Sequence, residues 1–543
     1  MKKSYLLAGL LSFGMLLIGC RDKNEVVDPE VDFGLDPGFA GKMEEVTPLK
    51  SKTRLSDIGL EFVDAIDAAT HENLVDVVAY MEEELDYLDI DQNYLDKLEG
   101  LATETGDHDD EYYARKYNPV SAIQGLMAMS LDAAQNGAQL ATRADDIYMF
   151  TLKAGLKDLY GGFKPNMKYK EWVYNESITD RLEVEFTDDH NQTWVATLKG
   201  SKETTRVHLL VEDISKWKET NDYGWSDEPN VYEDGHHDKY NISIDVPKVI
   251  TLVVKCNQEE IINLTANSSL ALDVDVYDNY NSESFYGSDE NGDWYYEHNS
   301  ESKFKLKVDY TNLNLDASLN VNGYAETWKT EANKTGIKSI AEVKIDGKSM
   351  LKAEAFLNAD VDALIKQINE ANNYSDSYSS KDDNDEYEED EDFYFLKNTV
   401  KNFAMKLDIM GKAQVYGKCD SFAKMYEALI NDDKCYDYET DEFDFNEYAK
   451  YVDRINDTYS ITVHYDNTTT VQANVEFEAY QWEEEYWDGS YTYHDIRPVL
   501  IFAADDSRYC FEDYFTETSF SKLIDAVEEL TDEFEKMVED AYN

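Results

Sequence analysis

The spacing of apolar residues predicts helices in the first part of the folded chain. From residue 54 to residue 165, apolar residues recur every three or four positions with acids between them, a pattern typical of helices that bury one face. Asn118-Pro119 is typical of a further helix start, and Gly161-Gly162 of a helix end. The main stripes contain Leu55, Ile58, Phe62, Ile66, Leu74, Val77, Val78, Met81, Leu85 and Leu88.

From residue 166 onward, apolar residues recur at every second position. In RLEVEF, Leu182, Val184 and Phe186 share one face, and YNISIDV, ALDVDVY and VQANVEFEAYQW alternate in the same way. Such alternation is typical of antiparallel strands with one wet face. We therefore expect a β region over 166–373 that ends in a helix, and a second α+β region over 394–543 with a C-terminal helix. Between them, the acidic low-complexity run at 374–393 predicts a disordered loop.

These patterns together predict an α+β fold: a helical N-terminal region followed by large antiparallel β-sheets packed by helices. A faint internal echo connects NLNLDASLNVNG at 312–323 with KLDIMGKAQVYG at 406–417. Two related halves would explain this echo, and so would chance similarity between amphipathic strands.

The first twenty residues have a pattern of their own. Lys2 and Lys3 precede an apolar run that ends at Ile18 and is shorter than the roughly 20 residues of a membrane-spanning helix. Gly19-Cys20 follows, and the chain becomes charged at once. This arrangement resembles the lipobox of bacterial lipoproteins. The resemblance implies that residues 1–19 are a signal segment and that Cys20 is lipidated, which would attach the protein to a membrane.

The same resemblance suggests a location. An arginine, and not an aspartate, follows Cys20, which in lipoproteins of this kind points to the outer membrane of a Gram-negative bacterium. Acids around Lys23 look like the export tag of surface lipoproteins, with a periplasm-facing protein as the alternative. Residues 20–53 mix Pro, Gly and acids, and we expect them to form a flexible acidic tether.

Charge narrows the range of partners. The formal net charge of −64 repels phosphates, so nucleic acid is excluded as a partner. A solvated acidic surface explains this charge, and so would cationic partners. Four cysteines other than Cys20 lack CxxC spacing, which argues against metal-thiolate and redox roles.

Few residues suggest chemistry. The chain has no G-x-S-x-G, H-E-x-x-H or Walker A motif. Asp289, Asn291 and Asp293 alternate as calcium ligands do, although Gly292 falls one place early for an EF-hand, and a solvated turn is the alternative. Calcium is the one cofactor that we consider. His236-His237 could bind a metal, but we prefer a polar loop at this segment. With 114 acids, no carboxylate pair of a hydrolase can be chosen.

Aromatic residues gather in segments that we expect to connect strands. Aromatic faces stack on sugar rings, and nearby carboxylates accept hydrogen bonds from hydroxyls. These rings could equally hold the tips of hairpins in place. The candidate binding residues are Trp225, Trp294, Tyr295, Trp482 and Trp487.

Three hypotheses for function follow. We favour a membrane-anchored envelope lipoprotein with a non-enzymatic binding or structural role, whose one-sided sheet could enclose an apolar small molecule. The second hypothesis is a surface glycan-binding lipoprotein that uses the aromatic residues. The third is a hydrolase with an unidentified carboxylate pair.

Overall fold

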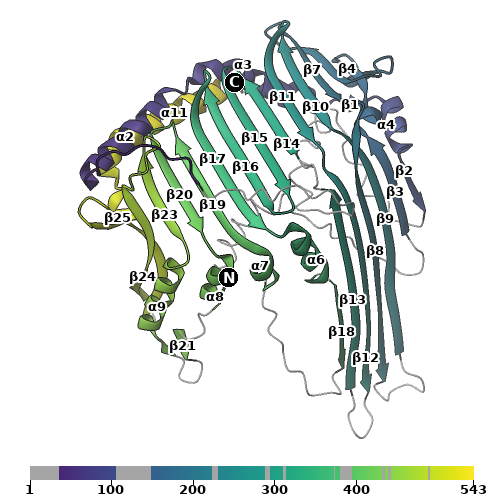
Figure 1. Ribbon diagram of the computed structural model, residues 1–543. Helices are drawn as coiled ribbons and strands as arrows, with labels where there is room; N and C mark the ends of the chain where they lie inside the picture. The colour runs from purple at the N-terminus through teal and green to yellow at the C-terminus, as the bar shows by residue number, and fades with distance from the viewer. Residues whose placement is uncertain are drawn as a thin grey trace.

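The computed structural model shows two large β-sheets with helices at their margins (Figure 1). It describes residues 36–105, 148–222, 230–287, 294–309, 314–371, 373–379, 394–430, 435–437, 442–486 and 489–542. Strands contain about twice as many of these residues as helices do.

The α+β class with a helical N-terminal region is therefore wrong. The apolar stripes do form short helices, namely α2 (Pro48–Asp64), α3 (Glu72–Tyr80) and α4 (Gln92–Glu99), but strands follow from residue 148 onward. Gly161 and Gly162 do not end a helix. They begin a strand, and a Cβ on Gly162 would meet the Ile178 side chain at 2.6 Å. Close packing of the Tyr174 and Ile178 side chains against the backbone explains these glycines. The expected helix after Asn118-Pro119 lies outside the described residues.

The first sheet, called the main sheet below, has seventeen strands. It is antiparallel except for the β1–β5 and β4–β6 pairs. Its registers give the following order: β1 (Asp89–Ile90), β5 (Glu171–Asn175), β4 (Gly161–Asn166), β6 (Leu182–Thr187), β7 (Thr193–Gly200), β10 (Val249–Cys256), β11 (Glu259–Ser268), β14 (Asn314–Val321), β15 (Tyr324–Asn333), β16 (Gly336–Ile345), β17 (Lys348–Ala359), β19 (Val400–Ile409), β20 (Ala413–Cys419), β23 (Ser460–Tyr465), β24 (Ala473–Tyr486), β25 (Gly489–Phe502) and β26 (Arg508–Cys510).

The second sheet has seven strands and contains the longest ones, which extend away from the main sheet in Figure 1. Its order is β18 (Tyr374–Ser379), β13 (Trp294–Asp309), β12 (Ala271–Gly287), β8 (Thr204–Asp222), β9 (Asn230–Pro247), β3 (Tyr148–Gly155) and β2 (Ala102–Thr105). Two of its pairs, β12–β8 and β3–β9, are parallel, so the expectation of purely antiparallel sheets is also wrong. Because Tyr374–Ser379 form β18, the start of the expected disordered loop is a strand.

The two sheets share their strands. β8 follows β7 after three residues, and Lys248 alone separates β9 from β10. In the main sheet β11 lies beside β10, whereas in the second sheet its continuation β12 lies beside β8. The two-stranded ribbon therefore turns over at the junction between the sheets: the β10 strand of the ribbon faces β11 in the main sheet, and the β8 strand faces β12 in the second sheet. Gly200 lies there, and a Cβ on it would meet the Pro247 Cγ at 2.5 Å.

One face of the main sheet, called the inner face below, is apolar. In β16, Ile337, Ala341 and Val343 lie on this face, and Lys338 and Glu342 lie on the opposite, outer face. The registers place Leu357, Ala353 and Leu351 of β17 opposite the three apolar residues, so the apolar sets of neighbouring strands share a face.

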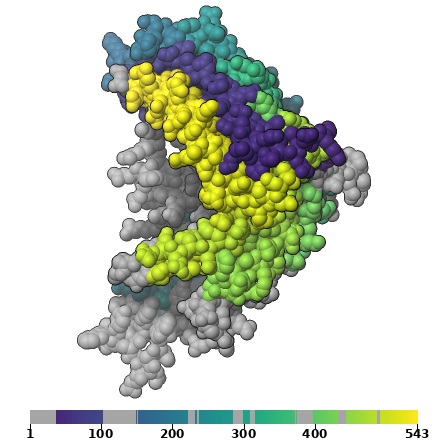
Figure 2. All heavy atoms as spheres, turned by 90° about the vertical axis from the view of Figure 1, so that its left-hand side faces the viewer, coloured from purple at the N-terminus to yellow at the C-terminus, as the bar shows by residue number. Residues whose placement is uncertain are grey.

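Helices cover the two ends of the inner face. At one end, α6 (Val361–Ala371), α7 (Tyr394–Thr399) and α8 (Phe422–Leu429) pack on β17 to β20, and α9 (Phe445–Asn456) packs on β24. At the other end, α2 packs on β20 and β23. The C-terminal helix α11 (Glu517–Ala541) lies along α2, as Figure 2 shows in yellow beside purple. The remaining short elements are η1 (Ala68–His71), η2 (Met81–Leu85), η3 (Leu156–Leu159), α10 (Phe511–Tyr514), β21 (Tyr436–Asp437) and β22 (Glu442–Phe443).

Residues 36–46 cross the outer face at Phe39 and reach the cluster beneath α2 at Met43 and Val46. The backbone N–H of Val46 donates to Gln472 Oε1 at 2.8 Å, and the Phe39 ring lies 4.2 Å from the His464 ring. Because these residues are docked and α2 begins at Pro48, residues 36–53 do not form the free tether that we expected over 20–53.

The internal echo does not mark two related halves. Residues 314–321 form one strand and the hairpin turn follows at Asn322-Gly323. In the second segment the turn, at Met410-Gly411, falls in the middle. The two similar stretches therefore occupy different positions in their hairpins.

Replacing Gly200 with Ala should destabilise the protein by about 1–3 kcal/mol, because the new methyl group would overlap the rigid Pro247 ring at the ribbon junction. The matched control is Gly417→Ala, whose Cβ would meet its nearest neighbour at an ordinary 3.6 Å. Urea denaturation of both variants measures the effect. Equal midpoints for the two variants would contradict the role assigned to Gly200.

Candidate functional site

The middle of the inner face contains large apolar side chains that remain exposed. Trp328 on β15, Met405 on β19 and Val415 on β20 are 43%, 51% and 36% exposed. They lie between the two groups of helices. Contiguous exposed apolar surface on a soluble protein commonly marks a place where something binds.

The registers join these three side chains into one surface. Trp328 pairs with Ala341, Ala341 with Ala353, and Ala353 with Leu407, which pairs with Val415. Small alanines therefore separate the larger residues at each end of this row. A long apolar molecule could lie across the alanines between them.

The second sheet continues this surface. Three inner rows cross β9, β8, β12 and β13 in register, and all their described side chains are at least partly buried. The residues of these rows are Ile244, Val207 and Leu272; Ile242, Leu209, Val274 and Leu306; and Tyr240, Val211, Val276 and Phe304.

Helix α6 shows that both apolar faces lie on the same side. Val361 and Ile365 of α6 pack against Leu272 and Leu306 of the second sheet. The same cluster includes main-sheet residues such as Leu357. The two faces are together called the inner apolar surface below.

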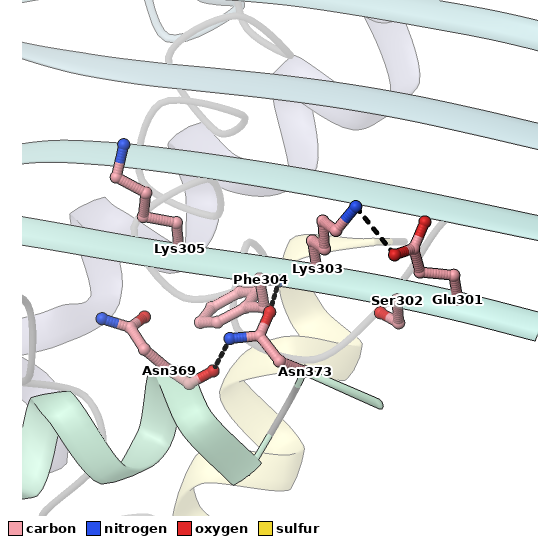
Figure 3. Close-up of a pocket in the computed structure, with 7 residues that line it drawn as sticks. All are labelled: Glu301, Ser302, Lys303, Phe304, Lys305, Asn369 and Asn373. Carbon is pink, nitrogen blue, oxygen red and sulfur yellow. Dashed lines mark hydrogen bonds and ion pairs between the residues drawn. The ribbon is translucent and has the colours of Figure 1, made fainter. Parts of the chain in front are cut away.

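A pocket of about 590 Å³ lies where α6 meets β13 (Figure 3). Asn369 of α6 and Asn373, which follows the helix, hold the β13 edge. Asn373 Oδ1 accepts from the Phe304 N–H at 2.7 Å, and Asn369 Oδ1 accepts from the Leu306 N–H at 2.6 Å. These side chains bond to the β13 backbone beyond Ser302, where the pairing of β18 with β13 ends. The pocket is lined by Glu301, Ser302, Lys303, Phe304, Lys305, Asn369 and Asn373.

A row of acids borders the apolar rows of the second sheet. Asp238 of β9 pairs with Asp213 of β8, which pairs with Asp278 of β12, and Asp278 pairs with Ser302. All four are in phase with the apolar residues of their own strands, so they lie on the inner face. They are called the acid row below. Asp238 and Ser302 are both 8% exposed.

Acids on the outer face of the same strands have basic partners. Asp273 accepts from Lys307 at 2.9 Å and lies 2.7 Å from His208 Nδ1. The Lys307 bond, followed by the His208 bond, holds the pKa of Asp273 below its ordinary value. Asp273 in turn raises the pKa of His208. Glu212 bonds to His237 Nε2 at 2.9 Å and to Lys239, and these bonds lower the pKa of Glu212.

Two groups of described side chains have ligand atoms close enough to hold a metal ion. The first is His208, Asp273 and Asp275, but Lys307 and Lys305 already contact both carboxylates. An ammonium group at each carboxylate competes with a metal ion for the same oxygens. In the second group, Asp188 already accepts from Trp194 Nε1 at 2.8 Å and from the Gln192 N–H at 2.7 Å. Neither group is therefore a good metal centre.

Several candidates from the sequence lie outside the described residues: Cys20, Trp225, Trp487, Asp289, Asn291 and Asp293. The backbones of Trp294 and Tyr295 begin β13, opposite Tyr286 and Phe285 of β12. His237 lies within β9 and not in a loop, so the expectation of a polar loop at His236-His237 is wrong. All four cysteines in the described residues are buried free thiols: Cys256, Cys419, Cys435 and Cys510.

Trp482 is the one aromatic candidate whose side chain the structure describes. It lies within β24, and its ring is near-parallel to the rings of Tyr480 and Tyr493, at 5.2 and 5.4 Å between centroids. The Arg497 guanidinium lies over Tyr480 at 5.2 Å. This stack uses ring surface that a sugar would need.

The acid row was missed from the sequence, although a signal is present. In RVHLLVED and ALDVDVYD, the apolar phase ends directly in Asp213 and Asp278. In β9 the order is reversed, and Asp238 precedes Tyr240 and Ile242 in the same phase. An aspartate stands at an apolar position of the alternation in each of three strands, and this could have been noticed in the sequence. Only the pairing of the strands shows that the three aspartates are neighbours.

Replacing His208 with Asn should remove a pH-dependent part of the stability. Folding raises the pKa of His208 above its ordinary value of about 6.5, so the charged pair with Asp273 stabilises the protein below that pH. This contribution is lost as the pH rises through the raised pKa. The urea midpoints of the two proteins should therefore converge as the pH rises from about 6.5 through the raised pKa of His208.

Asp273→Asn is the matched control, and its effect should not add to that of His208→Asn, since both variants remove the same pair. A midpoint difference that stays constant with pH would contradict this account.

No helix among the described residues is long and apolar enough to cross a membrane. Comparison of the chain with protein-family models, with curated proteins and with solved structures finds no match.

Proposed function

We propose that this protein is a membrane-anchored envelope lipoprotein that binds an apolar small molecule on its inner apolar surface and has no enzymatic activity. The observation that carries the proposal is the exposure of Trp328, Met405 and Val415 on a surface that continues over the second sheet. The site is a binding surface in chemical terms, because its described residues present apolar side chains and no nucleophile with a paired base.

The magnitudes favour a ligand with a long apolar chain. Each methylene removed from water contributes about 0.8 kcal/mol. A chain of about ten methylenes thus gains roughly 8 kcal/mol before the costs of ordering and of lost translational freedom, which are of similar order. Affinities in the micromolar range therefore need an extended surface of the kind that these strands provide.

The anchor in this proposal is Cys20, through the resemblance of LLIGC to a lipobox. Among the first described residues, Phe39 packs on the outer face against His464 and Tyr416. Attachment at that side leaves the inner apolar surface free. We place the protein at the outer membrane of a Gram-negative bacterium, on the cell surface, with the periplasmic side as the alternative.

Glycan binding and hydrolysis have less support. Among the described candidates for glycan binding, Trp482 is engaged with two tyrosine rings. For hydrolysis, the described histidines beside carboxylates on the second sheet, His208 and His237, are held in ion pairs on the outer face.

A double variant with Met405→Glu and Val415→Glu should weaken binding of the neutral apolar dye N-phenyl-1-naphthylamine at least tenfold. Both side chains are already exposed, so the charges should spoil the surface without disturbing the core. Dye fluorescence is titrated with the chain from residue 21 onward, which lacks the predicted signal segment and lipidated cysteine.

The matched control is Thr327→Glu, which changes the neighbour of Trp328 on the outer face of β15. It should bind the dye as the unchanged protein does. If the dye does not bind, or binds both variants equally, the proposal is wrong.

A further inference from the structure

The inner face of the second sheet changes character beyond the acid row. The next residues of β8 on this face are Ser215, Trp217 and Glu219. The registers place Tyr280 of β12 opposite Ser215, and Tyr232 of β9 opposite Glu219. Because side chains alternate along a strand, all five lie on the same face as the acid row. They belong to the ends of the long strands that lie far from the main sheet (Figure 1).

Three aromatic side chains form an exposed line here, which is called the aromatic line below. Tyr280, Trp217 and Tyr232 are 39%, 41% and 55% exposed. They come from three adjacent strands, and each ring lies two residues further from the acid row than the one before. Such diagonal neighbours are about 8 Å apart, so the line is roughly 16 Å long. An exposed line of this length can contact several units of an extended ligand.

Two of these rings are not used by the fold. Within the described part of the chain, Trp217 and Tyr232 form no ring contact and no side-chain hydrogen bond. Trp482 differs, because its ring is stacked between those of Tyr480 and Tyr493. Paired aromatic rings have centroids about 4.5–7 Å apart, so rings on diagonal neighbours about 8 Å apart leave their faces for a ligand. None of the three rings was chosen from the sequence, since only the registers bring them into line.

Serines occupy positions beside and between the rings. Those on the same face are the partly buried Ser215, Ser282, Ser284 and Ser300. A serine hydroxyl both donates and accepts hydrogen bonds. An alkyl chain that covered these hydroxyls would leave them without water, at a cost of about 1–3 kcal/mol for each group. A ligand with hydroxyls of its own avoids this cost, so the chemistry here differs from that of the inner apolar surface.

Charge decides between neutral and acidic ligands. Glu219 lies at one end of the aromatic line, and the acid row lies at the other. The lysines of β8 at these levels, Lys216 and Lys218, are in the outer phase, where Lys218 pairs with Glu283 at 2.9 Å. An anionic ligand would meet repulsion from these acids and from a chain of net charge −64. Neutral hydroxyls can instead donate hydrogen bonds to the carboxylates.

We propose that the aromatic line binds a neutral, linear glycan, whose sugar rings lie on Tyr280, Trp217 and Tyr232. A sugar ring has an apolar face of C–H groups and a rim of hydroxyls, which matches aromatic rings that are separated by serines. The site is distinct from the inner apolar surface and does not depend on the proposed function. The protein then holds a glycan at the far ends of the long strands and an apolar molecule nearer the main sheet.

Native gel electrophoresis in gels that contain one polysaccharide at a time tests the proposal. The neutral probes are hydroxyethyl cellulose, galactomannan, dextran and amylose, and the anionic probes are polygalacturonate and alginate. The chain from residue 21 onward should be retarded by at least one neutral probe and by neither anionic probe. Trp217→Ala should raise the polysaccharide concentration needed for half of the retardation at least tenfold. Trp217→Phe should keep most of the retardation, and Trp217→Leu should lose it, because the contact needs a ring face.

Trp328→Ala is the matched control. Trp328 is the same residue type with nearly the same exposure, 43% against 41%, but it lies on the main sheet. This variant should keep the retardation and weaken binding of the apolar dye, whereas Trp217→Ala should do the reverse. Urea midpoints close to that of the unchanged protein show that both variants are folded.

The outcomes separate this proposal from the proposed function. If no neutral polysaccharide retards the protein, or if the anionic probes retard it equally, the aromatic line is not a site for neutral glycans. If Trp217→Leu keeps the retardation, or if Trp217→Ala weakens dye binding, the line is an extension of the apolar surface and the proposal is overturned. Retardation that depends on Trp217 in a protein that does not bind the dye would support the glycan site and contradict the proposed function.

Discussion

The architecture depends on one constraint, the alternation of a mostly apolar and a mostly polar face on strands whose registers stay in phase. From β10 to β25, the registers place the apolar set of each strand beside the apolar set of the next. A slip by one residue would turn one strand's apolar set toward solvent. The inner apolar surface is therefore a product of register, and the helices cover its ends.

The second sheet shows how the fold extends this surface. The β8–β9 ribbon continues β7 and β10, but it changes sides at Gly200 and Pro247. This reversal brings β8 beside β12 in parallel, so that Asp213 and Asp278 become neighbours. The ribbon junction at Gly200, where no side chain fits, thus determines which acids meet on the inner face.

Part of this fold could be predicted from the sequence. RLEVEF, YNISIDV and ALDVDVY all form strands, because alternation is a local signal. The fold class was wrong because the predicted helical region, 54–165, included residues 148–165, whose apolar residues and paired glycines fit strands equally well. The parallel pairs of the second sheet depend on the ribbon reversal, which no local pattern encodes.

The candidate site was harder to predict for the same reason. Trp482 was chosen for its residue type, and the structure places it in an aromatic stack within β24. The acid row comes from four separate strands between residues 213 and 302, and its aspartates look ordinary in a chain with 114 acids. Their shared phase has meaning only once β9, β8 and β12 are aligned.

The most direct measurement is photo-crosslinking with an apolar chain that contains a diazirine, followed by mass-spectrometric mapping of the labelled residues. This account predicts labels on the inner-face residues Trp328, Met405 and Val415 and on the apolar rows of the second sheet. Labels confined to the outer face, or to the hairpin that contains Trp482, would contradict it.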